Sequence, residues 1–234
     1  MKNKKIAPVL AVVLLIAVIV LFMVCSSILK KYMPTKEVED LNDYYALTSE
    51  EQMAVIKDNT VLDAKGICVD GKAYLDYNTV HDALNERFYW DSIEDLLVYA
   101  LPDQIVYADA ETKGSNGAPL LLVKDEEVYL TLGLIANYTD VQIQAFDSGD
   151  GKRVLINDWG ARNVARVKKN ASLRIKGGVK SKIVTDLGRD DTVTVIDTME
   201  KWSRVASPDG NVGDVENKRL SDVESQKFSG NFEA

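Results

Sequence analysis

Cysteine and histidine are nearly absent from this chain of 234 residues, which contains two cysteines and one histidine. Cys25 lies in a long apolar run and Cys68 in a strand-like run, so the two are expected too far apart to pair, and no disulfide framework is predicted. Cys68, without a second thiol beside it, is interpreted as a small buried hydrophobe rather than a nucleophile. His81 alone supplies neither a histidine-rich metal site nor a preferred Ser-His-Asp set. The sequence therefore predicts no cofactor and no catalytic residue.

A calcium site is also incomplete, although residues 147–158 have the spacing of a calcium-binding loop. Asp147 and Asp158 occupy positions one and twelve, yet Gly149 stands where position three needs an oxygen ligand, and the bidentate glutamate is absent. Turn chemistry instead predicts a hairpin here, and no metal site is expected.

Charged residues are absent from Ile6 to Leu29, whereas lysines stand on both sides of this run, at Lys2, Lys4, Lys5, Lys30 and Lys31. At roughly 1.5 Å per residue, the 20 residues from Ile6 to Cys25 span about 30 Å, the thickness of a bilayer's hydrocarbon core. We predict that residues 1–32 form a cytoplasmic tip and an uncleaved transmembrane anchor. Two alternatives stay open, a cleaved signal peptide and a lipoprotein signal, although the latter requires a small residue where Val24 precedes Cys25.

The lysines also predict the orientation of this anchor. The excess before the run places the N-terminus in the cytoplasm, although Lys30 and Lys31 weaken the asymmetry. The expected localisation is the cell membrane, with a single pass and with the C-terminal domains extracellular.

After the anchor, residues 33–58 predict a polar stalk that leads into a first strand at residues 53–57. Apolar and polar residues then alternate, and Asp70-Gly71 between two such runs predicts a β-hairpin. The spacing next becomes helical, and Asn78 or Thr79 could cap the start of this helix.

This hairpin and helix return about 55 to 57 residues later in the chain, where Tyr74-Leu75 aligns with Tyr129-Leu130 and Val80 with Ile135. One such unit has a sheet face too small to be stable alone. The repeat therefore predicts a single domain of two packed halves over residues 59–160.

The remaining block has short strand-like runs separated by turns every roughly 8 to 12 residues, which predicts a small all-β barrel over residues 161–222. Residues 223–234 are predicted to form a polar linker or tail. The expected fold class is α+β.

Two parts of the chain resemble known families. The segment "VDGKAYLDYNTVHDALN" and the strands after it resemble the copper amine oxidase N-terminal-like repeat of exported Gram-positive proteins, over about residues 61–159. Despite its name, that module is not implied to bind copper. The order "LRIKGG", "KIVTDLGRDDTVTVID" and "EKWSRVASPDGNVGDVENKRLSD" is similar to a bacterial SH3-like domain, which implies a wall-associated binding module.

The pairing of these modules behind an anchor resembles the front of clostridial exported proteins that carry a glycoside hydrolase family 18 barrel. The D-x-x-D-x-D-x-E motif of that family occurs nowhere in these residues, and the final segment is expected to be a linker. We therefore expect a membrane-anchored cell-wall binding or positioning protein without catalytic residues of its own. The alternatives are the non-catalytic N-terminal portion of a family 18-like hydrolase of peptidoglycan or chitin-like glycans, and an interaction module for another envelope protein.

Basic residues concentrate between residues 152 and 182, which contain ten lysines and arginines and one acid, Asp158. This segment therefore has a net charge of +9, in a chain whose net charge is −8. Such a cluster predicts a basic collar that attracts anionic wall polymers or membrane headgroups. Solvated strand edges are the alternative. No nucleic-acid partner is expected. The candidate ligand-binding residues are Arg166, Lys168, Lys169, Arg174, Lys176, Lys180, Trp159 and Trp202, because tryptophans can stack on sugar rings as well as pack in a core.

Overall fold

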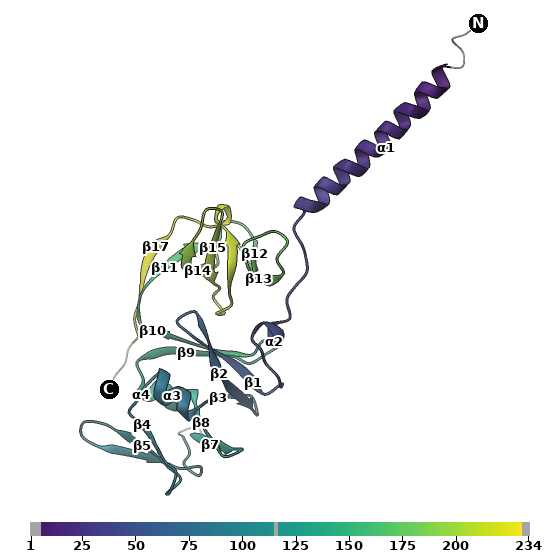
Figure 1. Cartoon of the computed structure of the whole chain (residues 1–234). Helices are drawn as coiled ribbons and strands as arrows, with labels where there is room; N and C mark the ends of the chain where they lie inside the picture. Colours follow the sequence, from purple (N-terminus) through teal and green to yellow (C-terminus); the bar gives the residue numbers. More distant parts are fainter. Residues whose placement is uncertain (1–5, 115–116, 231–234) are drawn as a thin grey trace.

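The structure is a computed structural model that describes residues 6–114 and 117–230. An apolar N-terminal helix is followed by a body made mostly of β-sheet, which agrees with the expected α+β class (Figure 1). We call residues 52–158 the first module and residues 160–228 the second module, because each contains one large sheet.

Helix α1, Ile6–Tyr32, confirms the predicted apolar helix. Its segment Leu10–Tyr32 is strongly apolar and is not buried against the body. By length and composition this helix can cross a bilayer, as a membrane anchor or as a signal sequence. Lys30 and Lys31 lie in its last turn, where cations interact favourably with the helix dipole.

The first module is built on a sheet with strand order β7-β8-β3-β2-β1-β10-β9. Its strands are β1 Gln52–Lys57, β2 Thr60–Val69, β3 Lys72–Asp76, β7 Leu121–Lys124, β8 Glu127–Thr131, β9 Val141–Phe146 and β10 Arg153–Asp158. Strand β1 confirms the first strand predicted at residues 53–57, and it lies inside this sheet, antiparallel to β2 and parallel to β10. The reason is its burial on both faces, since Met53, Ala54, Val55 and Ile56 are all completely buried.

The hairpins β2–β3 and β7–β8 are each followed by a short helix, α3 Tyr77–Ala83 and α4 Leu132–Tyr138. Both hairpin turns have two residues at positive φ, Asp70-Gly71 and Asp125-Glu126, as hairpins of this length require. Strands β3 and β8 pair with each other, so that Leu75 stands opposite Leu130.

Helix α3 is capped by Asp76 and not by Asn78 or Thr79 as expected. One carboxylate oxygen of Asp76 accepts a hydrogen bond from the backbone N–H of Thr79 at 2.9 Å, and the other accepts from the Thr79 hydroxyl. Because the helix begins at Tyr77, at least two residues earlier than a cap at Asn78 or Thr79 implies, the last residue of β3 becomes the cap.

Replacing Asp76 with alanine is expected to lower the free energy of unfolding by about 1 to 2 kcal/mol, because the first turn of α3 loses the acceptor of its free N–H. Asp82→Ala, at an exposed carboxylate of the same helix, is the matched control and should cost less than about 0.5 kcal/mol. Urea unfolding followed by tryptophan fluorescence measures both. Equal losses in the two variants would contradict the capping role.

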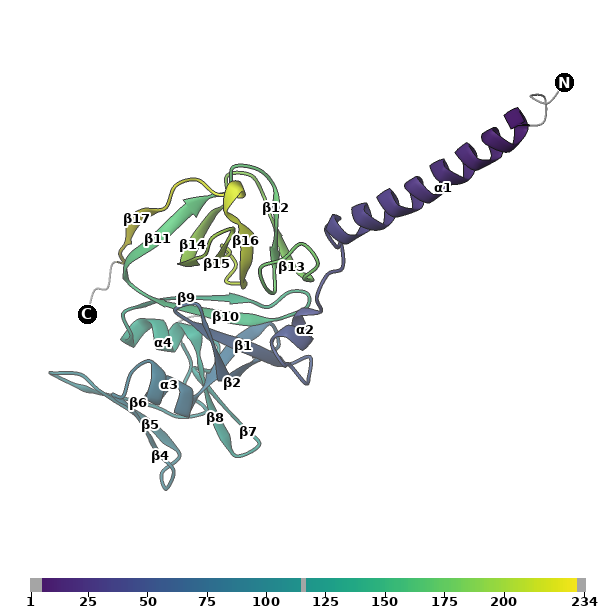
Figure 2. The ribbon, with the colours of Figure 1, turned by 45° about the horizontal axis from the view of Figure 1, so that its top comes forward.

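A smaller antiparallel sheet contains β4 Phe88–Asp91, β5 Leu96–Ala100 and β6 Ile105–Ala108. Helices α3 and α4 lie between this sheet and the first sheet (Figures 1 and 2). All of them share one core, which includes Val55, Val80, Phe88, Leu97 and Ile135.

The second module has the strand order β13-β12-β16-β15-β14-β11-β17. Its elements are β11 Gly160–Arg166, β12 Ala171–Arg174, β13 Ile183–Leu187, β14 Thr192–Thr198, β15 Trp202–Ala206, β16 Val212–Glu216, the 3-10 helix η1 Asn217–Arg219 and β17 Glu224–Phe228. Strand β17 corrects the expected polar tail, because it pairs with β11 along residues 160–164. Its side chains are mostly exposed, so the strand has no hydrophobic alternation for the sequence to show.

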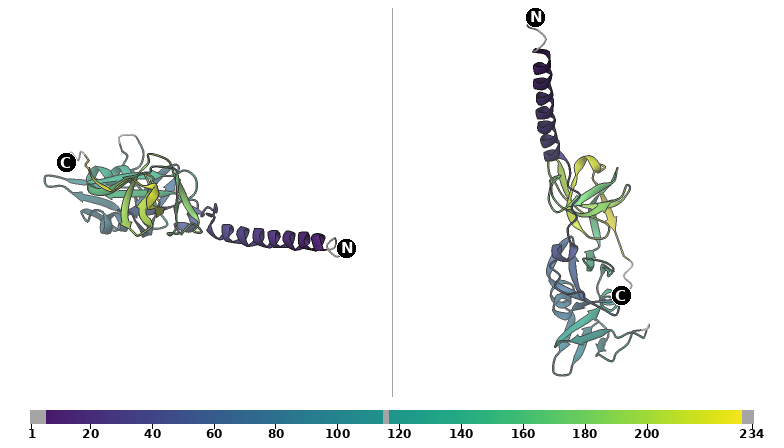
Figure 3. Two further views of the ribbon diagram at one scale, coloured as in Figure 1. Left: turned by 90° about the horizontal axis from the view of Figure 1, so that it is seen from above. Right: turned by 90° about the vertical axis from the view of Figure 1, so that its right-hand side faces the viewer.

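The predicted stalk is not a free spacer. The N–H of Thr35 donates to the carbonyl of Val179 at 2.8 Å. The N–H of Glu39 donates to the carbonyl of Ile183 at 2.7 Å, and the N–H of Ile183 donates to the carbonyl of Glu37 at 2.8 Å, on either side of the parallel bridge between Val38 and Ile183. The chain then enters α2, Leu41–Tyr44, against the first module. As a result the second module, although later in the sequence, lies between α1 and the first module (Figure 3).

Candidate functional site

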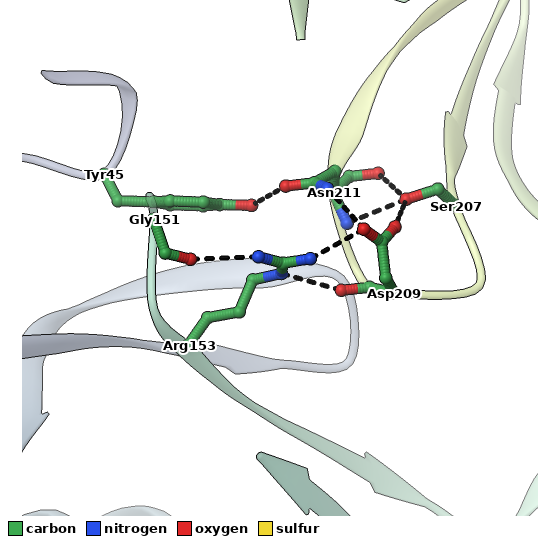
Figure 4. A network of polar contacts seen from close by, with 6 residues as sticks. All are labelled: Tyr45, Gly151, Arg153, Ser207, Asp209 and Asn211. Carbon is green, nitrogen blue, oxygen red and sulfur yellow. Dashed lines mark hydrogen bonds and ion pairs between the residues drawn. The ribbon is translucent and has the colours of Figure 1, made fainter. Parts of the chain in front are cut away.

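A buried polar network joins the two modules at the turn between β15 and β16 (Figure 4). Its members are Tyr45, Gly151, Arg153, Ser207, Asp209 and Asn211. Arg153, from β10, is only 5% exposed, and its guanidinium donates to the Asp209 carbonyl at 2.7 Å and to the Asp209 carboxylate at 2.6 Å. The Tyr45 hydroxyl donates to the side-chain oxygen of Asn211 at 2.6 Å. We call this network the joint.

The groups of the joint neutralise and satisfy one another. Arg153 also donates to the Gly151 carbonyl at 2.9 Å and lies 4.8 Å over the ring of Phe146. The side-chain amide of Asn211 donates to the Asp209 carboxylate at 2.9 Å. Burial raises the pKa of the Tyr45 phenol, so this hydroxyl stays a neutral donor at ordinary pH. Because the donors and acceptors of the joint bond to one another, the joint stabilises the contact between the two modules.

Neither a metal centre nor an unpaired polar site is found in the described part of the chain. Within residues 6–114 and 117–230, no group of three or more His, Cys, Asp or Glu side chains is placed to hold a metal ion. In the same residues every buried side-chain nitrogen or oxygen has a hydrogen-bond partner. Binding must therefore be sought on exposed surfaces.

Arg174, one of the predicted ligand-binding residues, is buried in β12. Its guanidinium donates to the carbonyl of Ser181 at 2.6 Å and to that of Thr35 at 3.2 Å. These bonds hold the segment after α1 against the second module. We therefore no longer assign Arg174 to a ligand surface.

The other predicted basic residues are exposed but do not form one continuous patch. Arg166 ends β11, and Lys168 and Lys169 follow it in the turn to β12. Lys176 and Lys180 lie in the loop between β12 and β13, where the Lys180 ammonium donates to the carbonyl of Lys30 at 2.7 Å. The basic run therefore divides into a group at the β11–β12 turn and a group beside the end of α1.

Four more basic residues of this run are used inside the protein. Arg153 belongs to the joint, and Lys152 donates to the carbonyl of Glu50. Arg162 donates to the Asp158 carbonyl, and Lys182 lies 3.2 Å from the Glu39 carboxylate. Arg153 is buried and cannot belong to a surface collar, whereas Lys152, Arg162 and Lys182 are partly exposed and bound to neighbouring groups of the protein.

The two predicted tryptophans are both partly buried. Trp202, at the start of β15, packs on Gly177, where an added Cβ would stand 3.0 Å from the ring. It also lines a cavity of about 630 Å³ that Tyr32, Pro34 and other residues complete. Trp159, between β10 and β11, packs against Gly230. Both positions favour packing, and Trp202 also borders this cavity.

Sequence reasoning missed an exposed aromatic row on the smaller sheet. Tyr89 of β4 pairs with Val98 of β5, which pairs with Tyr107 of β6, so the three side chains cross one face of the sheet. Tyr89 and Tyr107 are 58% and 54% exposed, and Ile105, two residues before Tyr107 in β6, extends the apolar face. Because neighbouring strands lie about 4.8 Å apart, the two tyrosines stand roughly 10 Å from each other. The sequence did contain a signal for this row. A strand with one solvent-exposed face usually alternates apolar and polar residues, whereas these strands are apolar on both faces.

Comparison with known proteins gave no match: no family model, no curated protein and no solved structure is similar to this chain. Its function is therefore inferred from the sequence and the geometry.

Proposed function

We propose that this chain is a membrane-anchored, extracytoplasmic protein that binds the cell wall and positions what it carries there, without catalytic residues of its own. The observation that best supports this proposal is the position of the smaller sheet relative to α1. The smaller sheet, β4–β5–β6, lies at the end of the body far from α1, where a wall outside the membrane would be met (Figures 1 and 3). This sheet carries the row of Tyr89, Val98 and Tyr107. Peptidoglycan or anionic wall polymers are the proposed partners, held by many weak contacts whose avidity adds.

The family resemblances belong to this proposal. The two hairpin–helix units and the pairing of Leu75 with Leu130 are compatible with a copper amine oxidase N-terminal-like repeat domain. The mostly antiparallel second sheet is compatible with a bacterial SH3-like barrel. An anchor and two such modules would serve equally as the non-catalytic N-terminal portion of a family 18-like glycoside hydrolase. The intact mass of the protein in the cell distinguishes the two proposals, because the hydrolase would be larger than these 234 residues.

Truncating the aromatic row is the test of wall binding. The full chain in mild detergent should co-sediment with purified bacterial cell wall, and the double variant Tyr89→Ala/Tyr107→Ala should bind at least about fivefold more weakly, because exposed aromatic side chains supply much of the contact with sugar rings. Ile196→Ala/Met199→Ala, which removes two exposed apolar side chains from the second module, is the matched control and should bind like the original chain.

Two outcomes would count against the proposal. A full chain that stays in the supernatant at low salt has no wall affinity of the proposed kind. A tyrosine variant that sediments as well as the control moves the contact to another face. A salt series adds a third reading, since retention that does not change with salt would remove any role for Lys168 and Lys169.

A further inference from the structure

The end of α1 is tied closely to the loop between β12 and β13. Only Met33 and Pro34 separate Tyr32, the last residue of the helix, from Thr35, whose N–H donates to the Val179 carbonyl at 2.8 Å. Three Cα steps reach at most about 11 Å, even when fully extended. The loop therefore cannot move away from the end of the helix without breaking this bond.

Two further contacts fix the same place. The Lys180 ammonium donates to the carbonyl of Lys30, one of the carbonyls at the C-terminal end of α1 that have no partner within the helix. The buried Arg174 guanidinium donates to the Thr35 carbonyl from the other side. If α1 spans a bilayer and ends at Tyr32, the loop then lies within or against the headgroup layer, which is about 5 to 8 Å thick on each side.

The charge of this region suits anionic headgroups. Lys30, Lys31, Lys176 and Lys180 are all exposed and stand at or beside the end of α1. Of the acids that border the region, Glu37 and Glu39 pair with Lys182, and Glu216 pairs with Lys218 and Arg219. Asp186 accepts a hydrogen bond from the Ser172 hydroxyl, and Glu200 lies beside Gly178 and Val179, so these two acids offset part of the charge of the lysines. At physiological ionic strength the Debye length is about 8 Å, so these lysines still attract a charged surface that they lie against, and higher salt weakens this attraction.

Aromatic and apolar groups complete the surface. Trp202 lies under Gly177 of the loop, and it shares its cavity of about 630 Å³ with Tyr32, Pro34 and Val179. Tryptophan and tyrosine are the side chains favoured at a membrane–water interface, because each has an apolar body and a polar end. Lysines beside them add attraction for anionic lipids.

We propose that the β12–β13 loop, residues 175–182, together with Trp202, is a platform that rests on the anionic phospholipid headgroups around α1 and fixes the angle at which the body leaves the membrane. This inference depends on α1 crossing the bilayer and is independent of wall binding. It gives the second module a partner at its membrane end, while the aromatic row of the first module stays free at the far end.

Hydrogen exchange of the full chain in lipid nanodiscs tests the platform. In discs with about one third phosphatidylglycerol, amides of residues 175–182 should exchange at least about fivefold more slowly than in pure phosphatidylcholine, and about 0.5 M salt should remove most of the difference. Lys176→Gln/Lys180→Gln should abolish the lipid dependence, and Lys176→Arg/Lys180→Arg should keep it. Lys72→Gln/Arg87→Gln, which removes two exposed charges from the first module, is the matched control and should behave like the original chain.

Each contrary result has a separate meaning. Exchange that is equal in the two lipids, or a lipid dependence that survives in Lys176→Gln/Lys180→Gln, overturns the platform. A chain that does not enter nanodiscs overturns the platform and the anchor together. Wall binding is measured in detergent, so its success or failure is read independently of both.

Discussion

Replacing Arg153 with methionine is expected to lower the free energy of unfolding by about 3 kcal/mol, because it removes a buried charge and leaves its partner groups at the joint unpaired. Methionine keeps much of the apolar stem volume, so the loss reports the guanidinium contacts to Gly151 and Asp209. The estimate is at the low end of the range for buried pairs, because the Asp209 side chain is 39% exposed and water can still reach it. Urea unfolding in mild detergent, followed by tryptophan fluorescence, measures the change.

A surface ion pair provides the control for this prediction. Lys124 pairs with Glu51, and both side chains are well exposed, so Lys124→Met should cost less than about 1 kcal/mol. If Arg153→Met loses no more than Lys124→Met, the joint contributes little and the two modules are held by other contacts. If the unfolding transition splits into two steps in Arg153→Met and in no other variant, the joint is the contact that makes the two modules unfold together.

Local chemistry predicted the elements whose signals lie within a few residues. The uncharged run gave α1, and Asp70-Gly71 gave the turn of the β2–β3 hairpin, where both residues have positive φ. Asp76 was missed as a cap only because the helix starts earlier than its apolar spacing suggests.

Features that depend on distant residues could not be read from the sequence. Arg153 and Asp209 are far apart in the chain, and Arg153 stood in a basic run that suggested a solvated surface. The aromatic row needs the register of three strands before Tyr89 and Tyr107 fall on one face. Strand β17 forms because it pairs with the edge of β11, and its own residues show no hydrophobic alternation. In each case the decisive partner belongs to another element.

Replacing Leu75 with alanine is expected to cost about 3 kcal/mol, because this residue is completely buried where β3 of one half pairs with β8 of the other. Leu130→Ala, at the position opposite, should cost a similar amount. The two leucines face each other at the seam of the repeat and share one core. The double variant should therefore lose less than the sum of the single losses, because the second truncation enlarges a cavity that already exists. Val123→Ala, at a half-exposed position on the neighbouring strand β7, is the control and should change stability by less than about 0.5 kcal/mol.

The form of the unfolding curve decides between one domain and two. If the halves are mutually dependent, Leu75→Ala and Leu130→Ala each shift the whole transition of the first module and leave it a single step, because neither half has a sheet face large enough to persist alone. Strictly additive losses, or a new step in which one half melts before the other, would contradict this dependence. The dependence matters for function, because the aromatic row of the smaller sheet lies on the core that the two halves build together, and it keeps its register only while that core is intact.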